Sequence, residues 1–263
     1  MKPKIRRVQS FRRGAIRPPL MLLILGLLVI LGGVPPAVSA EGDSCVWCHQ
    51  RPELKVTNKK LYDYYLRWSL SVHAQERITC SECHGGNPAT RDKEAAHGAK
   101  PIGASEQASP VHYRNIPKTC AQCHEEFFDQ YRLSNHFRHL TGKDQEQGPN
   151  CVTCHASVST TVLNVNTVRA TCELCHNEKT GNHPDIPDKA ERLLADFLSI
   201  QRFSRFLALK GGLLPDRAAV QSIEEQTDHL FVEWHTFDLA AIERRTAELL
   251  TLLKKKRDEI RKR

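Results

Sequence analysis

Apolar residues in the last third of the chain recur at helical spacing, in two runs separated by glycines. The first run follows Asp188 and Glu191, whose spacing is typical of a capping box, and Gly211 indicates its end. Pro215 opens the second run. The apolar positions are Leu193, Leu194, Phe197, Leu198 and Phe203, then Val220, Ile223, Leu230, Trp234, Phe237, Ala241, Leu249, Leu250 and Leu253. Residues 187–263 are therefore predicted to form an antiparallel helical hairpin.

A third apolar run, from Leu20 to Val34, follows a basic start and precedes the small residues Val38-Ser39-Ala40. This order is typical of an export signal, so residues 1–40 are predicted to be cleaved after Ala40. The alternative is an uncleaved membrane anchor, although a comfortable span needs about 20 apolar residues. Both alternatives place the rest of the chain in the periplasm or another extracytoplasmic space, and the second anchors it to the cytoplasmic membrane.

The formal net charge of +8 is concentrated at the start of the chain. Seven lysines and arginines, without an acidic residue, precede residue 41, so the remainder carries 8 − 7 = +1. A chain so nearly neutral has no broad basic surface for a phosphate backbone, which argues against nucleic-acid binding. The basic C-terminal end, LLKKKRDEIRKR, is interpreted as a solvated helix end, with docking on acidic lipid or an acidic partner as the alternative.

Between these regions, all ten cysteines occur as five CxxCH motifs. Two cysteines three residues apart lie on one side of a helical turn, where both can form thioethers with the vinyl groups of one haem, and the next histidine can bind its iron. Zinc is the alternative, but five pairs divide badly among four-ligand sites. The predicted attachment residues are Cys45, Cys48, Cys80, Cys83, Cys120, Cys123, Cys151, Cys154, Cys172 and Cys175, and the proximal iron ligands are His49, His84, His124, His155 and His176.

Five covalently bound haem c groups would leave little protein for each. Cys45 to His183 spans 139 residues, or about 28 per haem, too few to surround each cofactor with its own apolar pocket. The haems are therefore expected to pack on one another and to form a continuous path for electrons. Residues 41–186 are predicted to be a pentahaem cytochrome c domain, mostly α with little β, whose core is built from haem.

Histidine is the predicted second axial ligand, because the only methionines are Met1 and Met21, inside the predicted signal. Without methionine ligation the haems should have low potentials. Eight histidines lie outside the motifs. His73 and His136 rank first, because each ends a Ser-x-His element that follows an aromatic-rich stretch and precedes a motif. Three further distal candidates are His97, His112 and His183, and His139 is interpreted as a polar neighbour of His136. His229 and His235 are interpreted as packed or polar helix histidines, with the alternative that the long helix carries a ligand back to an otherwise open haem, His235 being the first to test.

These features resemble the multihaem c-type cytochromes related to hydroxylamine oxidoreductase, its tetrahaem electron acceptor and pentahaem nitrite reductase. The CxxCH series, the Ser-x-His elements at 71–73 and 134–136, the CHGGNP run at 83–88 and the closing helices carry the resemblance. It implies stacked and near-perpendicular haem pairs in a mostly helical shell. The nitrite reductases have lysine in place of histidine in one motif, whereas all five motifs here end in histidine.

The predicted function is electron transfer through low-potential bis-histidine haems, between a quinol-linked donor and a terminal reductase, another multihaem cytochrome or an external acceptor, with no catalytic residue. One alternative is a membrane-anchored quinol dehydrogenase, since Cys45 lies only eleven residues after Val34. Another is an enzyme in which one open-site haem binds a small nitrogen or sulfur species. The C-terminal helices are a predicted surface for homo-oligomers.

We predict that five haems stay attached when the protein is extracted with acidic acetone, because each is held by two thioether bonds. The mass of the intact protein after extraction measures the number. A mass corresponding to fewer haems in the wild-type protein would contradict the assignment of at least one motif.

Overall fold

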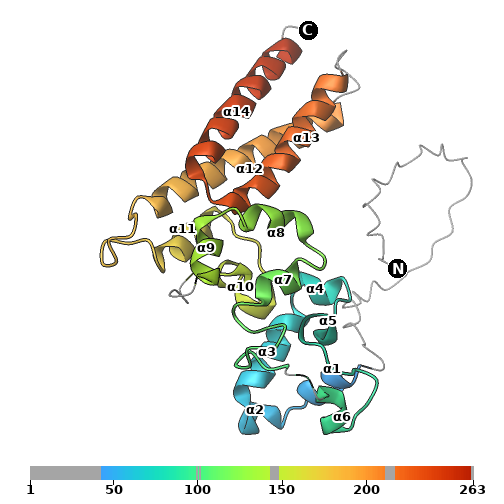
Figure 1. The fold of residues 1–263 in the computed structure, drawn as a ribbon. Helices are drawn as coiled ribbons and strands as arrows, with labels where there is room; N and C mark the ends of the chain where they lie inside the picture. The colour runs from blue at the N-terminus through green and yellow to red at the C-terminus, as the bar shows by residue number, and fades with distance from the viewer. Residues whose placement is uncertain (1–42, 99, 101, 143–147, 211–216, 262–263) are drawn as a thin grey trace, which may run out of the picture. The chain divides into compact units, whose positions relative to one another are not determined.

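Short helices make up the first two-thirds of the described chain, and three long helices make up the last third (Figure 1). The structure is a computed structural model and describes residues 43–98, 100, 102–142, 148–210 and 217–261. These residues all belong to one unit, Val38–Arg263, and contain no β-strand. The predicted mostly α fold is confirmed. The predicted signal, residues 1–40, lies outside the described residues, and among those described no helix is long and apolar enough to cross a membrane.

The helices follow one another in the order α1 Ser44–His49, α2 Leu54–Thr57, α3 Lys59–Ser69, α4 Val72–Gln75, α5 Cys80–His84, α6 Lys93–His97, α7 Ile116–Cys120, α8 Glu125–Tyr131, α9 Asn135–Thr141, α10 Cys151–Cys154, α11 Val165–Glu173, α12 Ile186–Lys210, α13 Arg217–Glu233 and α14 Leu239–Arg261. Among the described residues, the short 3-10 helices η1 Ser157–Ser159 and η3 Trp234–Thr236 lie between them.

The main apolar core lies among α12, α13 and α14, which pack on one another. Its buried side chains recur at the spacings predicted from the sequence, so each long helix turns one apolar face inward. The cluster contains Leu193, Phe197, Ile200, Leu207, Val220, Ile223, Leu230, Ile242, Leu249 and Leu253.

The predicted two-helix hairpin is corrected to three helices. The second apolar run does not form one helix, because α13 ends at Glu233 and Phe237 adopts a left-handed backbone conformation with φ of 54°. The side chain of Asp238 then accepts a hydrogen bond from the backbone N–H of Ala241 at 3.0 Å and caps the start of α14. The helical periodicity of the apolar residues continues across this break, so periodicity alone does not reveal it. Gly211 and Pro215, which the sequence places between the runs, lie outside the described residues.

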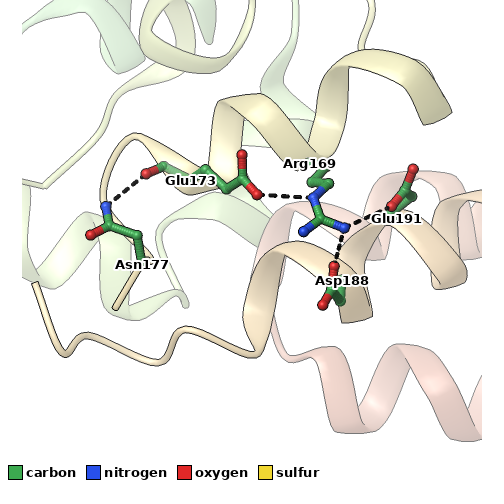
Figure 2. Close-up of polar contacts among 5 residues, drawn as sticks. All are labelled: Arg169, Glu173, Asn177, Asp188 and Glu191. Atoms are coloured by element: carbon green, nitrogen blue, oxygen red, sulfur yellow. Dashed lines mark hydrogen bonds and ion pairs between the residues drawn. The ribbon is translucent and has the colours of Figure 1, made fainter. Parts of the chain in front are cut away.

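The predicted capping box of Asp188 and Glu191 is also corrected. The helix α12 begins at Ile186, because Pro187 in its first turn needs no hydrogen-bond acceptor for its nitrogen. Asp188 and Glu191 instead pair with Arg169 on α11, as Figure 2 shows. Arg169 also contacts Glu173 at 2.9 Å. The three carboxylates therefore meet one guanidinium that links α11 to α12.

Residues 43–185 contain few buried apolar side chains of their own. Among the described residues of this segment they are Val46, Ala74, Tyr131, Leu140 and Val168. These residues lie in different helices and do not form a cluster comparable with the C-terminal core. The segment is therefore held by capping hydrogen bonds and by any cofactor that packs between its helices.

We predict that Ile223→Ala lowers the free energy of unfolding of the C-terminal helices by about 2–5 kcal/mol, because Ile223 is 0% exposed and its loss leaves a cavity in their core. Denaturant unfolding followed by tryptophan fluorescence measures the loss. Leu209→Ala on α12 is the control, with an expected change below about 0.5 kcal/mol, since Leu209 is 86% exposed. Equal losses in the two variants would contradict the assigned core.

Candidate haem-binding sites

Side-chain caps fix the first turn of three of the CxxCH motifs. Asp43 accepts a hydrogen bond from the backbone N–H of Cys45 at 2.8 Å, at the start of α1. Thr79 and Asn150 cap α5 and α10, each in a capping box. These caps hold the first cysteine in a helical turn, which brings the cysteine three residues later to the same side. The third and fifth motifs begin instead in the last turn of α7 and α11.

The cysteines of successive motifs are neighbours in the fold. Burial raises the pKa of the Cys80 thiol to about 12, and Cys45 of the preceding motif adds to this shift. Burial likewise raises the pKa of Cys83, with a further contribution from Cys120 of the next motif. The cysteines of the first three motifs are therefore close enough to interact electrostatically, in the order in which the motifs occur along the chain.

The same relation continues into the last two motifs. A hydrogen bond with Cys151, followed by burial, raises the pKa of Cys120. Burial is the main cause that raises the pKa of the Cys154 thiol to about 11, and Cys172 of the fifth motif adds to this shift. All ten cysteines are free of disulfides, as expected for residues reserved for cofactor attachment.

Three motif histidines hold one ring nitrogen against a backbone carbonyl. In His84, Nδ1 donates a hydrogen bond to the backbone carbonyl of Ile102 at 3.0 Å. The histidines of the fourth and fifth motifs make equivalent bonds. The carbonyl oxygen can only accept, so Nδ1 carries the proton and Nε2 is left with its lone pair. This is the tautomer that a metal-binding histidine needs. The other two bonds join His155 to Thr161 at 3.0 Å and His176 to Asn182 at 2.9 Å.

Four motif histidines lie opposite a second histidine at a nearly constant separation. The ring centroids are 6.4 Å apart for His49 and His97, 6.1 Å for His124 and His73, 6.0 Å for His176 and His136, and 6.3 Å for His155 and His235. An imidazole nitrogen binds a first-row metal at about 2.0–2.1 Å and lies about 1.1 Å from its ring centre, so two imidazoles on opposite sides of one iron have centroids roughly 6.3 Å apart. All four pairs fit that separation.

Serine caps explain how the two Ser-x-His elements present their histidines. Ser71 accepts a hydrogen bond from Ala74 at 3.2 Å, and Ser134 accepts one from Phe137 at 3.0 Å. Each serine is therefore an N-cap, which places the histidine at the second position of a new short helix. His73 precedes the second motif but lies opposite the histidine of the third, and His136 precedes the fourth but lies opposite that of the fifth.

The CHGGNP run brings His97 to the first motif. Gly86, with φ of 85°, turns the chain so that the backbone N–H of Asn87 donates a hydrogen bond to the carbonyl oxygen of Ala96 at 2.7 Å. Ser44 N–H donates to Pro88 at 2.9 Å. The turn is therefore bonded to α1 on one side and to α6 on the other, and these helices carry His49 and His97.

Burial disfavours the charged form of several paired histidines. Burial, followed by His176, lowers the pKa of His136 to about 4, and its Nδ1 is buried without a partner among the described residues. Burial is also the first cause of the lowered pKa of His49 and His73. Neutral imidazole is the form that binds metal, so burial favours ligation over protonation.

The surface beside the motifs suits a large apolar cofactor. Leu70 is 81% exposed just before the first Ser-x-His element, and Leu133 is 64% exposed just before the second. Trp47 and Leu174, each within a motif, are exposed as well. A haem bound between the paired histidines would cover apolar surface of this kind and supply the core that residues 43–185 lack. The residues present thus fit haem.

Comparison with known proteins gives an independent result for part of the chain. Residues 106–177 match the family described as cytochrome c7 and related cytochrome c. The match supports a multihaem c-type cytochrome. It covers 72 of the 263 residues and includes the third, fourth and fifth motifs. Nothing matched in the searches of curated proteins and of solved structures. The narrower relationship to hydroxylamine oxidoreductase stays a prediction.

The ring positions of His183 and His112 do not identify either histidine as a distal ligand. The ring of His183 is 6.5 Å from that of His176, but the Nδ1 edge of His176 faces Asn182, the residue before His183. His136 is closer to His176, at 6.0 Å. Nδ1 of His112 accepts a long hydrogen bond of 3.4 Å from Arg114 N–H. In the described part of the chain neither His84 nor His112 makes a ring contact with another histidine, so the roles of His112 and His183 stay predictions.

Sequence reasoning interpreted His229 and His235 alike, and the structure separates them. His229 lies 3.5 Å from Glu233 on an exposed face of α13. His235 lies beyond the end of that helix, opposite His155. The available signal was Asp238, a good N-cap residue directly before an apolar run, which predicts a new helix start and hence a turn containing His235.

We predict that Gly86→Ala weakens the pairing of His49 with His97. A side chain at this left-handed position is strained, and its Cβ would lie 2.6 Å from the carbonyl oxygen of Ala96, one residue before His97. The spin state of the haem iron measures the effect, and we expect part of one haem to become high-spin. Gly103→Ala is the control, because its Cβ would meet only the flexible end of Glu106 at 3.2 Å and then Ser105. Identical spectra for both variants would contradict the proposed role of the turn.

Proposed function

We propose that this protein is an exported pentahaem c-type cytochrome that transfers electrons between redox partner proteins. The observation that carries the proposal is the separation of the paired imidazoles. Three pairs join a motif histidine to a histidine predicted as a distal ligand: His49 with His97, His124 with His73, and His176 with His136. These separations support closed, bis-histidine iron sites, which hold an electron without binding a substrate.

The ten motif cysteines would hold the five cofactors covalently, and the five motif histidines would provide the proximal ligands. When bound, haem c supplies a one-electron iron couple at each site. The chain's own part is to fix the ligands: the caps orient the cysteines, and the carbonyls of Ile102, Thr161 and Asn182 orient three proximal imidazoles. Preorganised ligands limit the rearrangement that accompanies a change of charge at the iron.

The neighbouring positions of the cysteines support transfer from one site to the next. Cys80 neighbours Cys45, Cys120 neighbours Cys151, and the fourth motif neighbours the fifth. Covalent anchors this close in space favour close cofactors. The proposed path therefore follows the order of the motifs along the chain.

Low midpoint potentials of the haems favour redox partners whose own midpoint potentials lie in the same low range. No methionine occurs after Met21, so histidine is the ligand available for every closed site. A quinol-linked donor and a terminal reductase, another multihaem cytochrome or an external acceptor remain the proposed partners. The predicted signal segment underlies the proposed periplasmic location.

We predict that His73→Ala and His136→Ala each convert one haem from low-spin to high-spin while all five haems stay attached. The variants keep every cysteine and every proximal histidine, and they remove one imidazole from a closed pair. Electron paramagnetic resonance and resonance Raman spectra of the full-length protein measure the spin states, and the intact mass measures attachment. The open iron should also gain affinity for carbon monoxide.

The matched control is His229→Ala, an exposed histidine paired with Glu233, for which unchanged spectra are expected. Unchanged spectra in both His73→Ala and His136→Ala would overturn the proposed ligand sets. A high-spin haem already present in the wild-type protein would favour the enzyme alternative, in which one open site binds a small nitrogen or sulfur species.

A further inference from the structure

The turn between α13 and α14 carries a histidine that the ligand prediction does not include. His235 lies in η3, and the plane of its ring is nearly parallel to that of His155, with an interplanar angle of 14° and a centroid separation of 6.3 Å. The separation is the one expected for two imidazoles on opposite sides of one iron, roughly 6.3 Å. His155 is the proximal histidine of the fourth motif.

Both rings have the same hydrogen-bonding arrangement. Nδ1 of His155 donates to the carbonyl of Thr161 at 3.0 Å, and Nδ1 of His235 donates to the carbonyl of Val232 at 3.2 Å. A carbonyl oxygen accepts only, so Nε2 of each ring keeps a free lone pair. Carbonyl contacts of this kind fix the tautomer and the ring orientation of an iron ligand.

Aromatic packing holds His235 in place. The ring of Phe127 on α8 packs edge-on against it at 4.9 Å. Beside it, the indole nitrogen of Trp234 is a buried donor without a partner among the described residues, and so is the hydroxyl of Thr160 near the other ring. Buried donors of this kind suit the carboxylates of a haem.

The backbone of the turn is shaped so that His235 leaves the helix. Phe237 adopts φ of 54°, an uncommon conformation for an aromatic residue, and Asp238 starts the next helix. Phe237 also packs edge-on against His136 at 4.6 Å. The turn therefore touches one imidazole of the fourth site and one of the fifth.

We propose that His235 is the distal ligand of the haem attached at Cys151 and Cys154, so that the C-terminal helices complete the fourth haem site. This inference rests on the proposed function, because it requires a haem at the fourth motif. It gives the C-terminal helices a role in the redox chain: the turn between α13 and α14 holds an iron ligand that residues 43–185 do not supply.

The test uses His235→Ala in the full-length protein loaded with haem. The intact mass should still correspond to five haems, while electron paramagnetic resonance and resonance Raman show one haem changed from low-spin to high-spin. Added imidazole should restore the low-spin signal, which a merely structural role of His235 would not predict. His229→Ala, six residues earlier on the exposed face of α13, should show the wild-type spectrum.

A second variant covers the case in which His235→Ala loads fewer haems. His235→Met keeps a ligand at the position, so one haem should stay low-spin with a clearly raised midpoint potential, since methionine ligation raises the potential of a haem. A redox titration measures this shift. Five unchanged low-spin haems in His235→Ala, or an unshifted set of potentials in His235→Met, would overturn the assignment. A wild-type protein whose fourth motif carries no haem would instead overturn the proposed function itself.

Discussion

The pairing of imidazoles at an iron-sized separation is the constraint on which the rest of this structure depends. Residues 43–185 hold few buried apolar side chains, so the helices of that segment cannot be positioned by a protein core. Each pair joins residues that are far apart in sequence, as His73 and His124 are. Such a pair closes a loop of the chain once both rings bind one metal, and the loop-closure entropy is then offset by two coordination bonds.

The two parts of the described chain solve the problem of stability in different ways. The helices α12, α13 and α14 bury their own apolar faces, with Phe197 and Ile223 among the fully buried side chains. The segment before them has side-chain caps on its short helices, as Asp43 and Asn150 illustrate, and the proposed covalent haems would supply its apolar core. A small protein that binds several large macrocycles has no need of a second side-chain core, because the cofactors provide the apolar surface.

The local features were predictable from the sequence, and the long-range pairings were not. Five CxxCH motifs predict haem attachment whatever the fold, and the Ser-x-His repeat predicts two ligands because a serine cap fixes the histidine beside it. Which motif each ligand meets depends on tertiary packing: His73 passes over the second motif to lie opposite the third. Asp188 was misassigned because Pro187 lets the helix begin earlier, and because Arg169, distant in sequence, competes for the carboxylate. Helical periodicity runs through His235 and hides the turn.

The turn from Trp234 to Phe237 shows why a chain of this kind would retain a separate bundle of helices. A distal ligand within the haem-binding segment needs a short capped helix, and the sequence has two clear Ser-x-His elements. The fourth motif has no such element assigned to it, and its histidine lies opposite His235. His235 lies in the turn directly after α13, and its place is set by the packing of that whole helix, since α13 is fixed on α12 and α14 through Ile223 and Leu230. Phe237, with its left-handed backbone conformation, ends the turn that brings His235 beside His155, so this turn joins the bundle to the fourth motif.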